Sequence, residues 1–156
     1  MKPRNEKGFT LLEILVVISL ILIIAGIALP KFIGVASEGK KAKAAAELKT
    51  LQTALESYLL TNSSSPNGFT GAPGSDTLEG KLETATPRLI GDVSKFYDPF
   101  GDFATTNYRY EISPVRRYYV MWSEGPNLVS SITGINDSGV IQGSAGDDIY
   151  VSNGSF

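Results

Sequence analysis

The sequence predicts an α+β protein in which one long N-terminal helix, half transmembrane and half amphipathic, packs on a small antiparallel β-sheet of about three strands. Three observations lead to this fold class. Residues 8–29 are almost continuously apolar, apolar residues then recur at three- and four-residue spacing to about residue 62, and residues 107–112 alternate between polar residues and aromatic or apolar ones. Spacing of three and four indicates one face of a helix, whereas alternation indicates a half-buried strand.

The apolar stretch is long enough to cross a membrane. Residues 14–29 carry no charge, and with residues 9–12 the apolar length is about 20 residues, which at about 1.5 Å per residue spans a hydrocarbon core. The leader before it, residues 1–8, is positively charged, with Lys2, Arg4 and Lys7 against Glu6. Because positive flanks stay in the cytoplasm, we expect the C-terminal domain to cross the membrane.

Glu13 does not suit an ordinary membrane span. A lone carboxylate in lipid costs roughly 2.5–3.5 kcal/mol or more, and the apolar run contains no Lys, Arg or His that could neutralise it. A cut after Gly8 would give Phe9 an α-amino group, which is largely protonated at pH 7, and a helix N-terminus also favours a nearby carboxylate. The compensating charge can come from the same chain or from a neighbouring copy.

These residues carry a family resemblance. The run K-G-F-T-L-L-E at residues 7–13, followed by a long apolar helix, resembles the class III signal of the type IV filament superfamily, which comprises type IV pilins and the pseudopilins of type II secretion. The resemblance implies that a prepilin peptidase cuts between Gly8 and Phe9 and methylates the new amine to give N-methylphenylalanine. It also implies that Glu13 pairs with the N-terminal amine of an adjacent subunit.

A plain secretory signal is the alternative interpretation of the apolar stretch. Such a signal needs a small-residue cleavage site after its apolar region, and residues 25–28, A-G-I-A, could mimic one. The helical pattern continues beyond them, which favours the filament signal.

A kink is expected near Gly26 and Pro30, because proline inside a helix removes a backbone hydrogen bond and clashes with the preceding turn. The resemblance implies instead a loss of helix here in assembled filaments, and both outcomes stay open.

The second half of the helix, residues 31–62, is expected to be the spine on which the sheet packs, after the transmembrane and assembly half at residues 9–30. One face repeats Leu48, Leu51 and Leu55. A solvent-exposed coiled coil would need apolar heptads that continue further. Residues 63–106 are expected to form a variable loop with a short helical piece at 78–84.

The C-terminal region, residues 107–156, is expected to hold the sheet and a loop. Residues 107–112 and 117–123 read as a hairpin and residues 148–151 as a third strand. The sequences D-P-F-G at 98–101, W-S-E-G-P-N at 122–127 and G-D-D-I at 146–149 are similar to the C-terminal half of major pseudopilins, where the usual turn is D-P-W-G-N and an acidic loop binds calcium. Phe100 and Asp102 depart from that turn.

Calcium is therefore the one expected cofactor, and it prefers six to eight oxygen ligands. The resemblance points to Asp147 and Asp148 in the Gly-rich loop, with Ser123, Asn127 and Asp137 as further candidates. The alternative to a calcium site is that these carboxylates are solvated in the loop.

The chain has no Cys and no His, which excludes disulfides, Cys nucleophiles and Cys/His zinc sites. Pilins often close this region with a disulfide, so its absence shifts the resemblance toward pseudopilins.

The composition excludes other classes. The chain holds 14 Lys and Arg against 16 Asp and Glu, and removal of the leader makes it mildly acidic, so no nucleic acid is expected as a partner. No catalytic motif is present, which predicts that the protein is not an enzyme. The aromatic residues of the hairpin could form a sugar-binding face, although at strand spacing half of them are more often core.

The expected function is thus a structural subunit of a type II secretion pseudopilus, a helical filament of identical copies that supports protein export across the outer membrane. The expected partners are prepilin peptidase, an inner-membrane assembly platform with its ATPase, minor pseudopilins and the membrane itself. The expected location is the bacterial inner membrane with a periplasmic domain, and the periplasm or cell exterior for the filament. A type IV pilin for adhesion or motility, and a membrane-tethered carbohydrate-binding module, are the alternatives.

Overall fold

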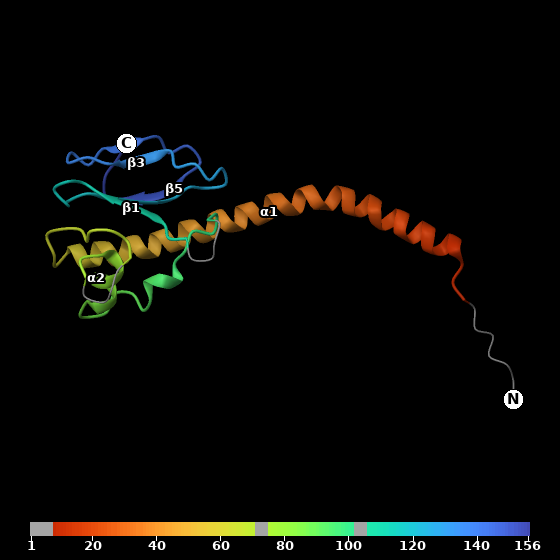
Figure 1. Ribbon diagram of the computed structural model, residues 1–156, viewed down its shortest axis with the longest axis horizontal. Helices are drawn as coiled ribbons and strands as arrows, with labels where there is room; N and C mark the ends of the chain where they lie inside the picture. Colours follow the sequence, from red (N-terminus) through yellow and green to blue (C-terminus); the bar gives the residue numbers. More distant parts are fainter. Residues whose placement is uncertain (1–7, 71–74, 102–105) are drawn as a thin grey trace, which may run out of the picture. The chain divides into compact units, whose positions relative to one another are not determined.

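The computed structural model describes residues 8–70, 75–101 and 106–156 (Figure 1). The leader up to Lys7, and Asp102 and Phe103 of the aromatic block, lie outside the described residues. The helical elements are α1 (Leu11–Leu59), α2 (Leu78–Thr84) and the 3₁₀ turn η1 (Val93–Lys95). The strands are β1 (Arg109–Ile112), β2 (Tyr119–Ser123), β3 (Ile132–Ile135), β4 (Ile141–Gly143) and β5 (Ile149–Ser152). The chain divides into two compact units, Met1–Glu38 and Gly39–Phe156.

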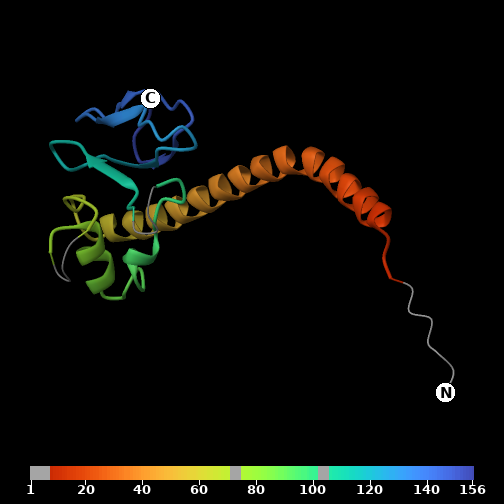
Figure 2. The same cartoon turned by 45° about the vertical axis from the view of Figure 1, so that its right-hand side comes forward.

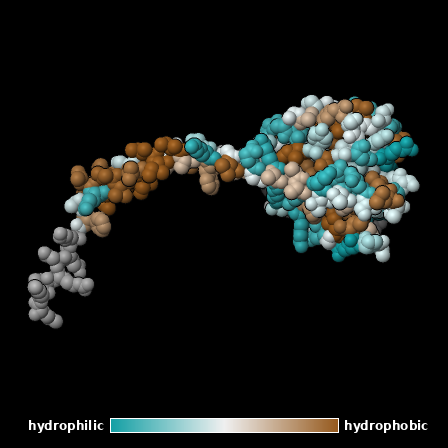
Figure 3. All heavy atoms as spheres, turned by 180° about the vertical axis from the view of Figure 1, so that it is seen from behind, coloured by the Kyte–Doolittle hydropathy of each residue, from teal (hydrophilic) through white to brown (hydrophobic). Residues whose placement is uncertain are grey.

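The first unit is the apolar part of α1. Its described large apolar side chains are exposed on every side, from Ile14 at 51% to Leu11 at 83%, and Figure 3 shows hydrophobic atoms along this stretch of the helix. By length and composition, this helix could cross a membrane. Pro30 lies inside the assigned helix, so the expected kink at Gly26 and Pro30 stays a prediction.

The second unit is built on the rest of α1, as the spacing of leucines predicted. Leu48, Leu51 and Leu55 are completely buried. They join one hydrophobic cluster with residues of α2, η1 and β2 and with the residue just before β1, namely Leu78, Leu82, Val93, Tyr119, Met121 and Tyr108. Within this unit, Figures 1 and 2 both show the strands on one side of α1 and α2 on the other. The amphipathic half of the helix is therefore a spine between two layers, and the short helix at 78–84 is confirmed.

The main sheet has three antiparallel strands in the order β1-β2-β5, which confirms the predicted sheet. In its register Tyr110 lies opposite Met121 and Trp122 lies opposite Tyr150. Every residue of β2 is buried because β2 is the central strand and both of its faces are covered. The first two predicted strands begin two residues before β1 and β2, and the third lies one residue before β5. Differences of this size are usual at the ends of secondary-structure elements.

A second sheet was not expected from the sequence. Residues 130–145, which read as a Gly- and Ser-rich excursion, contain the antiparallel pair β3 and β4. This pair buries Ile132, Ile135 and Ile141 against Val120 and Trp122. A register shift between Ile132 and Gly134 interrupts the alternation of apolar residues, and this interruption hid the strands. The three β-branched isoleucines in this segment were the feature of the sequence that could have indicated the two strands.

Four of the aromatic residues in and before the hairpin are core. Phe100, Tyr108, Tyr119 and Trp122 are each no more than 9% exposed. Their faces are therefore taken up by the protein's own packing, and a stacking surface for sugars gains no support from them. The D-P-F-G turn is confirmed by the hydrogen bond from Gly101 N to Asp98 O, at 3.1 Å.

Candidate functional site

The segment expected to be processed lies directly before α1. Gly8 is exposed and Phe9 is 85% exposed, so the peptide bond between them is accessible. Thr10 and Glu13 then form a capping box. Glu13 N donates to Thr10 Oγ1 at 3.2 Å, and Glu13 Oε2 accepts from both Thr10 N and Thr10 Oγ1 at 3.0 Å. The reciprocal pair satisfies backbone donors that the first turn of a helix leaves free.

This capping box was missed by the sequence analysis, although T-x-x-E is its usual signature. Glu13 therefore has an uncharged hydrogen-bond partner, Thr10, in its own chain. Both hydrogen bonds from Thr10 go to Oε2, so Oε1 stays accessible for a cation. The arrangement therefore fixes the carboxylate at the helix N-terminus and still allows a charged amine to approach it.

The C-terminal loops bring only some of the expected calcium ligands together. Asn127 N donates to Asp147 Oδ2 at 3.2 Å, and the Asn127 amide donates to Asp147 Oδ1. Gly125 makes this approach possible, because it has a φ of +67° and a Cβ there would overlap the Asp147 carbonyl oxygen. The two loops are thus joined at Asn127 and Asp147.

Asp148 faces a different partner. It is 8% exposed, and its Oδ2 accepts hydrogen bonds from Ser131 N at 2.8 Å and Ile132 N at 2.9 Å. Its Oδ1 is buried and has no hydrogen-bond partner among the described residues. Asp137, the fifth candidate, instead accepts from Val115 N at 2.8 Å. Within residues 8–70, 75–101 and 106–156 no three acidic, His or Cys side chains form a group that could hold a metal.

Ser123, the remaining candidate, belongs to a cluster around the buried Asp98. Ser123 Oγ donates to Asp98 Oδ1 at 2.7 Å, and Phe100 N donates to the same oxygen at 2.9 Å. Glu124 N donates to Asp98 Oδ2 at 3.3 Å. The carboxylate thereby joins the D-P-F-G turn to the end of β2. The sequence analysis named the turn but missed this role of Asp98, since Asp98 and Ser123 meet only in the folded chain.

The polar groups on the spine helix also contact the sheet. Tyr108 Oη donates to Glu47 Oε2 at 2.7 Å, and Tyr119 Oη donates to Glu56 Oε1 at 3.3 Å. Burial raises the pKa of both tyrosines, and the negative charges of Glu47 and Glu56 raise them further. Lys43 lies with its ammonium nitrogen 3.5 Å from the centroid of the Tyr97 ring. These contacts orient the strands on α1.

Comparisons with known proteins agree with this architecture. The family described as the prokaryotic N-terminal methylation motif matches residues 3–29. The type II secretion system core protein G of Aeromonas hydrophila is 37% identical over 107 residues, which cover 65% of this chain and 73% of that protein. The core protein G of Vibrio cholerae is 32% identical over 102 residues, covering 65% and 70%.

Pilins are also among the relatives. The type IV major fimbrial protein FimA of Dichelobacter nodosus is 31% identical over 81 residues, which cover 52% of each chain. No solved structure gives a significant match.

Proposed function

Because the chain belongs to the type IV pilin-like superfamily, as a relative of the type II secretion core protein G, we propose that it is a structural subunit that polymerises into a pseudopilus. The observation that carries this proposal is the combination of the matched methylation motif with an apolar helix that stays exposed all round. The work of such a protein is assembly rather than catalysis.

Processing is the first step of the proposed mechanism. A prepilin peptidase removes residues 1–8 and leaves Phe9 with a free, then methylated, amine. Support comes from the exposure of Gly8 and Phe9, ahead of a helix whose first turn is already capped by Thr10 and Glu13. Mass spectrometry of the purified native chain tests this step. We expect a chain that begins at methylated Phe9, and a chain that begins at Met1 would contradict the proposal.

Assembly is the second step. The amine of Phe9 in one copy approaches Glu13 of the next copy, and this contact sets the register between the two helices. Head-to-tail contacts that do not close on themselves generate a fibre. The subunit waits in the inner membrane with its second unit in the periplasm, and an ATP-driven platform and minor pseudopilins start and extend the fibre.

The Thr10–Glu13 box allows the register contact to be tested apart from helix capping. Glu13→Gln keeps an oxygen that can accept from Thr10 but removes the charge, so this variant should insert and be cut but should not assemble. Thr10→Ala removes the cap and keeps the charge, so it should still assemble. Sedimentation of sheared filaments, with mass spectrometry of the N-terminus, measures both properties. Normal assembly of the Glu13→Gln chain would refute the register role.

Calcium is a second proposal, and it rests on the C-terminal loops. Asp148 Oδ1 is a buried carboxylate oxygen without a hydrogen bond, and Asp147 and Asn127 lie on the adjoining loops. Oxygens of this kind suit calcium. Ser123 is engaged with the buried Asp98. The ion would be held by Asp148 and Asp147, and by Asn127 once its hydrogen bonds to Asp147 were replaced by contacts with the ion. A bound ion would hold the loop to the sheet in a chain that has no disulfide.

Melting curves of the full chain in calcium and in EGTA test this second proposal. We expect a higher melting temperature in calcium, and loss of that difference in Asp148→Asn. Asp137→Asn is the matched control, because Asp137 contacts the backbone of Val115 instead. Equal melting temperatures in calcium and EGTA would remove the site without affecting the proposed assembly.

An external type IV pilus is the second candidate function, favoured by the similarity to the fimbrial protein of Dichelobacter nodosus. Deletion of the gene separates the two candidates. Retention of normally secreted proteins inside the deletion strain indicates a pseudopilus, and loss of surface fibres or of adhesion with intact secretion indicates a pilus. A carbohydrate-binding module that never polymerises would show neither effect.

A further inference from the structure

We infer that Asn67 is a site of spontaneous modification, at which the side-chain amide is converted into a carboxylate through a cyclic imide formed with Gly68. Asparagine followed by glycine is the sequence in which this reaction has the least steric hindrance, because glycine has no Cβ beside the attacking backbone nitrogen. The chain contains two such pairs, Asn67-Gly68 and Asn153-Gly154. Both asparagines are exposed, so exposure alone does not distinguish them.

The two pairs differ in their hydrogen bonds. Asn153 Oδ1 accepts from Tyr119 N at 2.9 Å, and its amide donates to Arg117 O at 3.0 Å. The nitrogen that would attack, Gly154 N, donates to Ser152 Oγ at 2.8 Å. All three groups that must move in the reaction are therefore held. Gly154 is also closely packed, since a Cβ there would overlap the carbonyl oxygen of Gly139.

Asn67-Gly68 has none of these restraints among the described residues. The Asn67 side chain and Gly68 N make no hydrogen bond there, and beyond the two adjoining residues no atom lies within 4 Å of the position that a Cβ on Gly68 would take. Gly68 has a φ of +82°, which glycine adopts without strain. No hydrogen bond of the side chain or of Gly68 N therefore has to break before the side-chain carbon reaches the neighbouring nitrogen.

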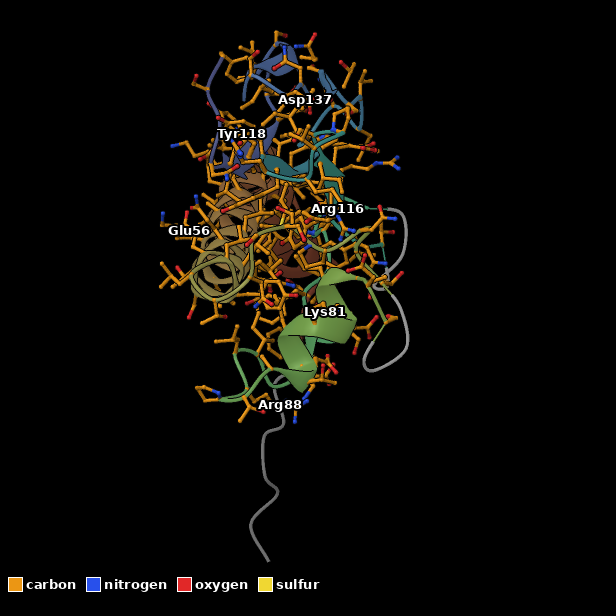
Figure 4. The ribbon with its side chains drawn as sticks, turned by 90° about the vertical axis from the view of Figure 1, so that its left-hand side faces the viewer. Glu56, Lys81, Arg88, Arg116, Tyr118 and Asp137 are labelled. Carbon is orange, nitrogen blue, oxygen red and sulfur yellow. The ribbon has the colours of Figure 1, made fainter. Side chains whose placement is uncertain are left out.

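The backbone around the pair is nevertheless fixed, so the free side chain is not a consequence of a loose loop. Arg116 Nε and Nη2 donate to Ser65 O at 2.9 and 2.6 Å, and Tyr110 Oη donates to Pro66 O at 2.9 Å. Asn67 N donates to Asp76 O at 2.7 Å. Figure 4 shows Arg116, the residue that anchors this loop to the β1–β2 hairpin.

The chemistry balances with water as the only added reactant. Gly68 N attacks Asn67 Cγ, so that a new N–Cγ bond forms, the Cγ–Nδ2 bond breaks, and ammonia leaves with the proton from the glycine nitrogen. Water then opens one of the two carbonyl–nitrogen bonds of the imide. Opening at Cγ gives aspartate, and opening at the backbone carbonyl gives isoaspartate, in which the main chain runs through the side-chain carboxyl carbon.

The product changes the surface of the loop. Residues 62–77 contain one acid, Asp76, and it is paired with Arg116 at 2.7 Å. Conversion of Asn67 adds a carboxylate to this loop, and the isoaspartate form also lengthens its backbone. Because the reaction needs no enzyme, older copies of the chain should carry more negative charge here than new ones.

The test is a time course of peptide mapping by mass spectrometry on the full-length chain, incubated folded in detergent and, in parallel, denatured in urea, in mildly alkaline buffer. We expect Asn67 to convert in both states, and folding to slow it less than it slows Asn153, because only the backbone of Asn67-Gly68 is held by hydrogen bonds. Folding should slow Asn153 by about tenfold or more, because several hydrogen bonds must break before its ring closes. Asn67→Gln should abolish conversion at position 67, since its longer side chain closes a less favourable ring.

Two results would overturn the inference. The first is no conversion of Asn67 in the folded chain while the denatured chain converts. The second is a folded chain in which Asn153 converts as fast as Asn67. Urea provides the internal positive control, so a slow reaction in the folded chain cannot be attributed to the buffer.

Discussion

Replacement of Asp98 by alanine should be among the most destabilising single changes in the second unit. The carboxylate is 5% exposed and accepts hydrogen bonds from Phe100 N, Ser123 Oγ and Glu124 N. A hydrogen bond to a charged group contributes about 1.5–3 kcal/mol, and a buried donor that loses its acceptor costs a further free energy of desolvation. With the longest of the three bonds given little weight, we expect a loss of about 4 kcal/mol from the free energy of unfolding.

Trp122 provides the assay, because it is the single tryptophan and is 4% exposed next to this cluster. Urea unfolding of the full chain, followed by its fluorescence, should show a midpoint lower by about 2 M for Asp98→Ala if the slope is about 2 kcal/mol per M. Asp98→Asn keeps one acceptor oxygen and should lose about half as much. Ser123→Ala removes one donor and should lose about 1 kcal/mol.

The test is whether the loss of unfolding free energy decreases in the order Asp98→Ala, Asp98→Asn, Ser123→Ala. A loss below about 1 kcal/mol for Asp98→Ala would show that the donors find water or other acceptors, and the argument from burial would then be wrong. A change in slope without a change in midpoint would indicate an altered unfolded state and not a lost contact.

Two further predictions concern the same unit. The pKa of Tyr108 and of Tyr119 is raised by burial and by a neighbouring carboxylate, so their contribution to stability is complete below about pH 10 and is lost as the pH rises toward the folded-state pKa. Urea unfolding in alkaline buffers should therefore show falling stability, with a smaller slope in Tyr108→Phe, and a flat profile for wild type would contradict this. Gly125→Ala should cost about 3 kcal/mol because its Cβ overlaps the Asp147 carbonyl, whereas Gly68→Ala, with a positive φ and open space, should cost about 1 kcal/mol. Equal losses in thermal melts would show that the overlap relaxes.

The sequence was most informative where function depends on neighbouring residues in the chain. Gly8, Phe9 and Glu13 lie within one short motif, so the expected processing and assembly segment could be named without any knowledge of the fold. The leucine spacing likewise located the buried face of α1, because a regular helix fixes the direction of each side chain. The three-stranded sheet followed from the alternation in β1 and from the aromatic and β-branched residues of β2.

Contacts between distant residues could not be obtained in this way. Asp98 and Ser123 are 25 positions apart, and their hydrogen bond depends on where two loops end after the sheet has formed. The β3–β4 pair was hidden by a bulge and by Gly134, with a φ of +151°, so that its isoleucines do not alternate regularly. The Thr10–Glu13 capping box is a different case. Its T-x-x-E pattern is local and could have been recognised, but only the charge of Glu13 was considered.

The exposed half of α1 explains why a single carboxylate can decide assembly. A helix that is apolar on every side must be covered by something other than its own domain. Before assembly that cover is lipid, and in a filament it is the helices of neighbouring copies. Lipid tails are as apolar as leucine, so the exchange of one cover for the other gains little from the hydrophobic effect and depends on packing and polar contacts. The proposed contact between Glu13 and the amine of another copy would exist only in the second state. The large apolar area of the helix adds little to the net free energy of assembly, so this one polar contact is a large part of it. For this reason Glu13→Gln should block assembly while the helix still inserts.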